Sequence, residues 1–182
     1  MTLIIAMLCT IMLLALGGAL MSTAATERQA AAAEDRGREA FHAAEAVAER
    51  ALADLAQMPD WATALDGSAQ SAFVDGPPSG GRVFGAVSLD LGVLTAEVDG
   101  WSTGDGPWRP FAYGPIAQLL PGEINSPMYA VAWVNADPDR PGAVLILAHA
   151  YGPAGTRRMI ELAIERAPFD AVRLVSWREY RQ

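Results

Sequence analysis

The first 26 residues contain no charged side chain. They read MTLIIAMLCTIMLLALGGALMSTAAT, and most of them are apolar. A helix needs about 20 apolar residues to cross the hydrocarbon core of a bilayer, so this run is long enough. Backbone N–H and C=O groups must pair within the segment in lipid, which favours a helix. Gly17 and Gly18 fit this prediction, because glycine is commoner in membrane helices than in soluble ones. We therefore expect residues 1–26 to form a membrane-spanning helix.

A secretory signal peptide is the alternative interpretation of the same run. Such a peptide opens with basic residues and has an apolar core of about 7–15 residues. No Arg or Lys precedes this run, and the run is longer than that core. The small side chains of residues 22–25 would nevertheless suit cleavage. Because the apolar run begins at residue 1, we expect a short polar leader to lie upstream or to have been removed.

Residues 27–58 are expected to continue the helix, but they are amphipathic rather than apolar throughout. Ala, Glu and Arg are strong helix formers and dominate this stretch, and no proline occurs before Pro59. Apolar residues recur every three or four positions and predict one stripe that packs on a sheet: Phe41, Ala44, Ala48, Leu52 and Leu55. No turn signal separates the two segments. We therefore expect one helix from about residue 2 to residue 57, roughly 80 Å long.

The remainder, residues 59–182, predicts a globular domain with an antiparallel sheet of about four strands. Segments rich in Gly, Pro, Ser and Asp predict irregular structure at 59–81 and 100–127, with a short helical turn at 116–120. The β-type runs are 82–89, 91–98, 128–135, 143–151, 156–166 and 171–177, the last of them as an edge strand. The helix stripe and one sheet face would share a single core. This arrangement belongs to the α+β class.

Composition excludes several classes of protein. The apolar content is too high for a disordered chain, and a single cysteine, Cys9, excludes a disulfide scaffold. The net charge is −8, and it is uneven: residues 51–150 carry 11 acidic and 3 basic side chains, whereas residues 151–182 carry 4 acidic and 6 basic ones. This acidic balance, without a basic cluster, argues against nucleic acid as a partner.

Residues with catalytic or metal-binding chemistry do not form a recognised motif. His42 is expected on the helix surface and His149 in a strand, and neither has the HExxH spacing of a zinc site. Asn135, Asp137 and Asp139 alternate like the ligands of a calcium loop, but the glycine at position six and the distal glutamate are missing. We interpret these three residues as turn-stabilising. The expectation is a protein that is not an enzyme and uses no cofactor or metal.

Five tryptophans are spread over the chain, and most are expected to anchor the core or the loops. Trp101 and Trp108 fall within the segment 100–127. An adhesive or subunit-contact surface there is a further interpretation.

Several motifs resemble the type IV pilin superfamily. The start MTLI at residues 1–4 is similar to a mature pilin N-terminus after leader cleavage. FHAAEA at residues 41–46 is similar to a stretch of PilX-like minor pilins. GPAGTRR at 152–158 and SWRE at 176–179 resemble the C-terminal part of the same proteins. Residues 59–142 carry no matching motif. The resemblance therefore covers both ends of the chain.

The resemblance implies a minor pilin, a structural subunit for type IV pilus assembly in a priming or tip complex, with roles in motility and cell adhesion. It implies other minor pilins, the major pilin, the inner-membrane assembly platform and prepilin peptidase as partners, with N-methylation at Met1. The chain would be a single-pass protein of the inner membrane with a periplasmic domain, and later part of the pilus at the cell surface. The alternatives are a minor pseudopilin of type II secretion, and a signal-anchored periplasmic binding or sensory domain that does not polymerise.

The resemblance also implies that the apolar half of the helix packs in a filament core, where glycines permit close approach of helices. The residues expected there are Leu3, Ile4, Ile5, Met7, Leu8, Leu13, Leu14, Gly17 and Gly18. Most pilins carry a glutamate at the position of Ile5, thought to pair with the N-terminal amine of a neighbouring subunit. A carboxylate in lipid is costly without such a partner. Its replacement by Ile5 is therefore expected for a subunit at the tip or in the priming complex.

Overall fold

The computed structural model describes residues 2–101, 104–119, 125–168 and 171–180, with only the backbone at Thr2, Cys9 and Trp101. The described chain falls into two compact units, Met1–Arg36 and Gly37–Gln182. Helix α1 (Thr2–Gln57) begins in the first unit and ends in the second. The prediction of one continuous helix is confirmed.

Small side chains form the buried stripe of α1 in the second unit. Ala40, Ala44, Val47, Ala51 and Leu55 are fully buried and recur at intervals of three or four residues. Four of these five are Ala or Val, so the helix can lie close to the sheet. Among the residues predicted for this contact, Ala44, Ala48 and Leu55 are buried, whereas Phe41 and Leu52 are partly buried at its margin.

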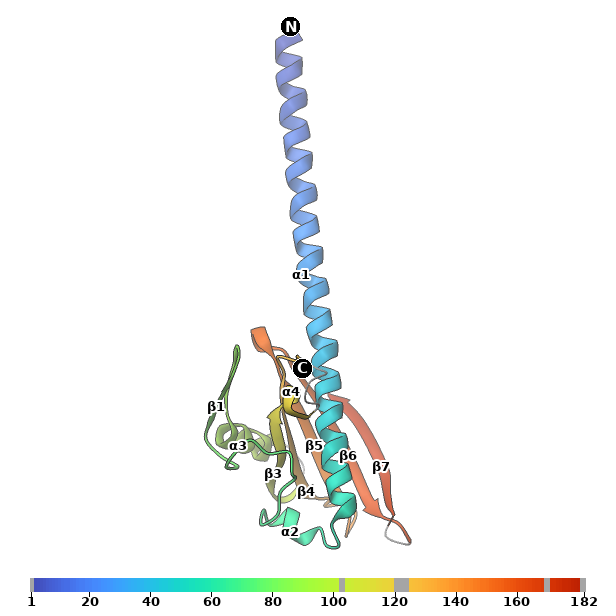
Figure 1. The fold of residues 1–182 in the computed structure, drawn as a ribbon. Coiled ribbons are helices and arrows are strands. Elements are labelled where there is room, and N and C mark those ends of the chain that lie inside the picture. Colours follow the sequence, from blue (N-terminus) through green and yellow to red (C-terminus); the bar gives the residue numbers. More distant parts are fainter. Residues whose placement is uncertain (1, 102–103, 120–124, 169–170, 181–182) are drawn as a thin grey trace. The chain divides into compact units, whose positions relative to one another are not determined.

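A five-stranded antiparallel sheet forms the body of the second unit (Figure 1). Neighbouring strands in the chain are neighbours in the sheet, so the topology is a meander. The strands are β3 (Asp105–Pro115), β4 (Tyr129–Ala136), β5 (Val144–Tyr151), β6 (Arg157–Arg166) and β7 (Val172–Tyr180). The last four confirm predicted strands, and β7 lies at an edge as expected. The short 3-10 turn η1 (Pro153–Gly155) joins β5 to β6.

The sheet is buried on both faces, whereas the sequence predicted one core. On β4, Ala130, Ala132 and Val134 pack in the cluster that contains α1, while Val131 and Trp133 pack in a second cluster on the other face. The second cluster includes residues of helix α3 (Leu91–Trp101) and of the hairpin formed by β1 (Gly81–Phe84) and β2 (Val87–Asp90). Because both faces are covered, β4 and β5 read as nearly continuous apolar runs rather than alternating ones.

Residues 91–98 are helical, so the predicted strand there is wrong. They belong to α3 (Leu91–Trp101). The Oδ1 atom of Asp90 accepts hydrogen bonds from the backbone N–H groups of Gly92 (2.8 Å) and Val93 (3.1 Å), which caps the helix N-terminus. Residues 82–89 were expected as one strand but fall in the hairpin of β1 (Gly81–Phe84) and β2 (Val87–Asp90). Gly85, with φ +56°, supplies the left-handed turn.

The predicted loop at residues 100–127 contains strand β3, which is the fifth strand of the sheet. Its three prolines are tolerated because β3 is an edge strand with register shifts along its pairing with β4. Backbone groups of Ser71 and Phe73 bond to Phe111 and Tyr113 at 2.9 and 2.8 Å and cover part of its outer edge. Within 116–120, α4 (Ile116–Leu119) confirms the helical turn, and residue 120 lies outside the described residues. In the irregular segment 59–81, α2 (Ala62–Leu65) adds one short helix.

Candidate functional site

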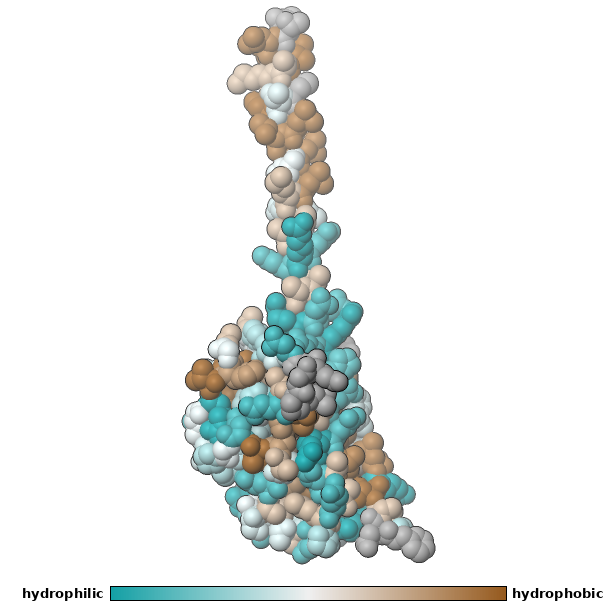
Figure 2. Space-filling model, viewed as in Figure 1, coloured by the Kyte–Doolittle hydropathy of each residue, from teal (hydrophilic) through white to brown (hydrophobic). Residues whose placement is uncertain are grey.

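The first part of α1 exposes a continuous apolar surface, shown in brown in Figure 2. The predicted assembly residues lie on it: Leu3, Ile4, Ile5, Met7, Leu8, Leu13 and Leu14 are all exposed. Gly17 and Gly18 have no neighbouring atom within 4 Å of the place a Cβ would take. The remaining predicted residue, Met1, lies outside the described residues. The nine described residues are therefore accessible to a partner or to lipid.

Three threonine side chains on this surface are paired within the helix itself. The Thr10 hydroxyl donates to the carbonyl oxygens of Ala6 (3.0 Å) and Met7 (2.9 Å). Thr23 and Thr26 donate to the carbonyl oxygens four residues earlier, at 3.1 and 3.0 Å. Such back-bonding satisfies a hydroxyl without water. A helix that is apolar all round belongs in lipid or among other helices. Over the described residues, α1 is the one helix long and apolar enough to cross a membrane.

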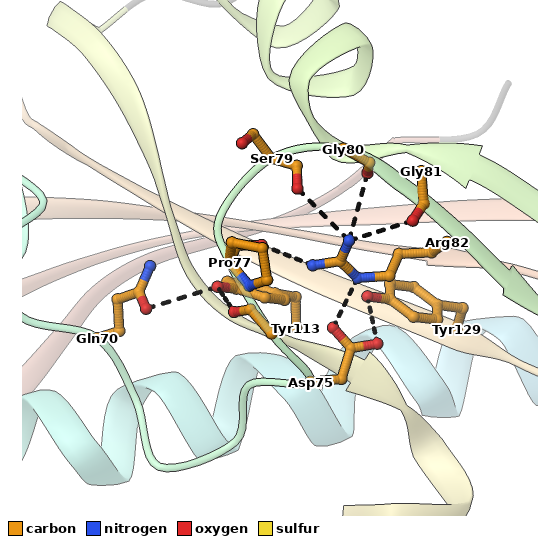
Figure 3. Close-up of polar contacts among 10 residues, drawn as sticks. Gln70, Asp75, Pro77, Ser79, Gly80, Gly81, Arg82, Tyr113 and Tyr129 are labelled. Atoms are coloured by element: carbon orange, nitrogen blue, oxygen red, sulfur yellow. Dashed lines mark hydrogen bonds and ion pairs between the residues drawn. The ribbon is translucent and has the colours of Figure 1, made fainter.

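An ion pair in the second unit clamps the loop between Asp75 and Arg82 (Figure 3). The Arg82 Nε–H donates to Asp75 Oδ1 at 2.9 Å, and the Tyr129 hydroxyl donates to Asp75 Oδ2 at 2.9 Å. The remaining guanidinium N–H groups donate to the carbonyl oxygens of Pro77, Ser79, Gly80 and Gly81. The hydroxyl of Tyr113 donates to the Gly76 carbonyl at 2.7 Å. The guanidinium thus holds the loop backbone around itself.

The charge states of Arg82 and Tyr129 are stable around neutral pH. The hydrogen bond with Asp75 raises the pKa of Arg82, which therefore stays cationic. Burial, together with donation to the Asp75 carboxylate, raises the pKa of Tyr129. Neither Arg82 nor Tyr129 exchanges a proton near pH 7, and the hydrogen bonds from Arg82 to the loop carbonyls position the loop. No sequence motif marks this cluster, although Arg82 is one of only three basic residues between 51 and 150.

The two histidines lie in different environments. His42 is on the helix surface, as predicted, with Nδ1 3.0 Å from Glu45 Oε2. His149 is 2 % exposed on strand β5, with its ring 5.0 Å from that of Trp133 and its Nδ1 2.8 Å from the Tyr151 hydroxyl. Burial lowers the pKa of His149 to about 3, with a smaller contribution from the Arg157 charge. His149 is therefore a neutral core residue at physiological pH.

Acidification is expected to destabilise the second unit through His149. The ordinary pKa applies in the unfolded chain, so the unfolded state binds a proton below about pH 6.5 while the folded state does not until about pH 3. Lowering the pH from about 6.5 to about 4.5 should remove about 2 kcal/mol of unfolding free energy. Urea unfolding across this range measures the effect. His149→Phe should lose this slope and His42→Gln should keep it; equal slopes in all three proteins would contradict the assignment.

The three residues that resemble a calcium loop lie at the end of β4 and in the turn to β5. Asn135 Nδ2 donates to the Gly106 carbonyl at 2.8 Å, and Asp137 Oδ1 accepts the Asp139 backbone N–H at 2.9 Å. The Asp137 bond supports the turn-stabilising interpretation, whereas Asn135 is a buried residue of β4 whose side chain bonds to β3 rather than within the turn. Within the described ranges, no group of three or more His, Cys, Asp or Glu side chains could hold a metal ion.

Comparisons with other proteins add no relative. The chain matches no family model, no curated protein and no solved structure. The architecture places the chain in the α+β class, with one long apolar N-terminal helix and a five-stranded antiparallel sheet.

Proposed function

We propose that the chain is a non-enzymatic minor pilin, a subunit of a type IV pilus that acts in the priming or tip complex. One observation carries the proposal: α1 is a single helix whose first part exposes an apolar surface and whose last part is buried in the core with the sheet. One element thus combines a membrane-type surface with an anchor in a folded domain. The motifs at residues 1–4, 41–46, 152–158 and 176–179 support the same conclusion.

The proposed subunit uses the apolar surface twice. It first holds the chain in the inner membrane, with the globular domain in the periplasm. On assembly, the apolar surface leaves the lipid and packs against the helices of other minor pilins and of the major pilin. Lipid is as apolar as leucine, so close packing rather than the hydrophobic effect must favour this exchange. The open surroundings of Gly17 and Gly18 suit a close approach.

Deletion of the gene in its native cell tests the proposal. We expect fewer surface filaments, restored by the full chain, while type II secretion stays unchanged. Filaments at the normal number with impaired secretion would favour a minor pseudopilin. Filaments and secretion both unchanged would favour a periplasmic domain that is only anchored by its helix.

Ile5 provides a test of the tip or priming role. Its side chain is 60 % exposed on the apolar surface, so Ile5→Glu places a carboxylate where helices are proposed to pack. An unpaired carboxylate in this environment costs up to about 3 kcal/mol, so we expect Ile5→Glu to lower filament number and incorporation. Ile5→Leu is the matched control and should behave as the natural chain. Unchanged incorporation and filament number for Ile5→Glu would count against any role for this position.

A further inference from the structure

Strand β7 forms an open edge of the five-stranded sheet (Figure 1). In the described part of the chain its one strand neighbour is β6, so the backbone groups on its other side face no strand. The opposite edge, at β3, is partly covered by the backbone bonds from Ser71 and Phe73. A long exposed edge strand is a template for pairing with another chain, and β7 has nine residues.

One face of β7 carries large apolar side chains that the fold leaves exposed. Leu174 is 51 % exposed and Trp177 is 48 % exposed. They lie opposite Ile164 and Leu162 of β6, whose side chains pack in the core with α1. Both therefore lie on the α1 side of the sheet, and Figure 2 shows apolar side chains over this strand. We call Leu174 and Trp177 the apolar strip.

The other face of β7 carries positive charge. Arg173 and Arg178 pair across the sheet with Glu165 and Glu161 of β6, on the face opposite α1. The arginine side chains are 67 % and 65 % exposed, whereas the two glutamates are 28 % and 16 % exposed. The positive charges therefore lie outermost, beside the open edge. A guanidinium has five N–H donors, so each arginine can hold a second carboxylate.

A bulge arranges these side chains in two equivalent pairs. Leu174 lies opposite Ile164 and Ser176 lies opposite Ala163, so Val175 is an extra residue in the pairing with β6. The strand thus offers an arginine next to an apolar residue at 173–174, and the reverse order at 177–178. In both pairs the arginine and the apolar side chain point to opposite faces.

These charges select the partner strand. A second copy of β7 would bring the same two arginines and one glutamate, Glu179, so like charges would meet across the junction. A strand that alternates acidic and apolar residues complements both faces, because successive side chains of a strand point to opposite sides. We propose that β7 binds an extended acidic and apolar segment of another protein by strand addition. This proposal does not depend on the proposed role in pilus assembly.

Peptide binding to the full chain in nonionic detergent micelles tests the proposal. The first probe is a fluorescein-labelled peptide of alternating Val and Glu with blocked ends. The second replaces every Glu with Lys, and the third keeps the first sequence but has every backbone nitrogen methylated, which removes the N–H donors. Fluorescence anisotropy measures the dissociation constants. We expect saturable binding of the first peptide, and binding at least about 10-fold weaker for the other two, because charge pairs become repulsive or ladder bonds are lost.

Three results would overturn the proposal. They are no saturable binding of the Val-Glu peptide at millimolar concentration, equal binding of the lysine peptide, and equal binding of the methylated peptide. A dimer of the full chain by light scattering that Leu174→Thr abolishes would also overturn it, because the occupant of the edge would then be a second copy.

Variants locate the binding at β7. Arg178→Gln removes one charge and Leu174→Thr removes part of the apolar strip, both at exposed positions where folding should be retained. Each should weaken binding of the Val-Glu peptide about 2–5-fold, the usual contribution of one cross-strand pair. The matched controls, Arg28→Gln on α1 and Val83→Thr on β1, change exposed residues away from β7 and should bind normally. Unchanged binding by both β7 variants would refute the site.

Discussion

Leu13→Arg combined with Leu14→Arg is expected to remove the chain from the membrane. The two leucines are 67 % and 75 % exposed near the middle of the uncharged segment. Each arginine near the centre of a membrane helix costs about 2.5–3.5 kcal/mol, so the pair costs roughly 5–7 kcal/mol. Extraction of membranes with alkaline carbonate, followed by immunoblotting, measures the chain that remains inserted. We expect a loss of nearly all of it.

The matched control places the same two charges elsewhere on the same helix. Ala31 and Ala32 are also exposed, but they lie in the part of α1 that already carries charged residues. Ala31→Arg with Ala32→Arg should leave the chain in the membrane fraction. Equal retention of both double variants would show that the apolar segment does not anchor the chain.

Trp133→Ala is expected to cause the largest loss of stability in the second unit. Trp133 is fully buried on the sheet face opposite α1, where its Nε1–H donates to Thr95 of helix α3. Truncation of a buried tryptophan costs about 3–5 kcal/mol, because it removes packing and leaves a cavity. The Thr95 hydroxyl also loses the N–H donor that it accepts from, and keeps only its own bond to the Leu91 carbonyl. Guanidinium unfolding followed by far-UV circular dichroism measures the change in the free energy of unfolding.

Trp177→Ala is the comparison for this substitution. Trp177 is 48 % exposed on edge strand β7, where its ring lies T-shaped to that of Phe41 with the centroids 6.3 Å apart. We expect a loss of about 1 kcal/mol or less, typical of a partly exposed site. Losses of similar size for the two tryptophans would contradict the second core.

The helix and four strands were predictable because their signals are local. No proline or turn signal occurs between residues 19 and 57, and the buried positions of α1 recur at helical spacing. Strands β4 and β5 are apolar runs bounded by turn residues, and the GPAG turn indicates that β6 returns beside β5. The sequence therefore contained most of the α+β architecture.

The remaining elements depend on contacts that are distant in sequence. Residues 91–98 have strand-type composition, and the Asp90 cap together with burial against the sheet makes them helical. Strand β3 contains three prolines and becomes a strand by pairing with β4. The second core was not predicted, because the odd-numbered apolar residues of β4 pack against helix α3, and α3 itself was not predicted from the sequence.

The candidate sites also differ in whether their residues are close together in the sequence, and therefore in how far they could be predicted. The apolar surface of α1 could be predicted residue by residue, because it is one uninterrupted run. A cavity of the second unit, lined by the segment 66–79, helix α3 and strand β3, draws its lining from residues 66 to 110, which share no spacing pattern. The Arg82 clamp likewise joins Asp75 to Tyr129 across 54 positions.

Site-specific photocrosslinking in sheared filaments tests the central claim most directly. A benzoylphenylalanine at position 13 should link the chain to the N-terminal helices of other pilins in the filament fraction. The same probe at position 83, which is highly exposed in the second unit, should give no such helix links. A chain that is absent from sheared filaments, with position 13 linked only to lipid, would contradict the proposal that it is a pilus subunit.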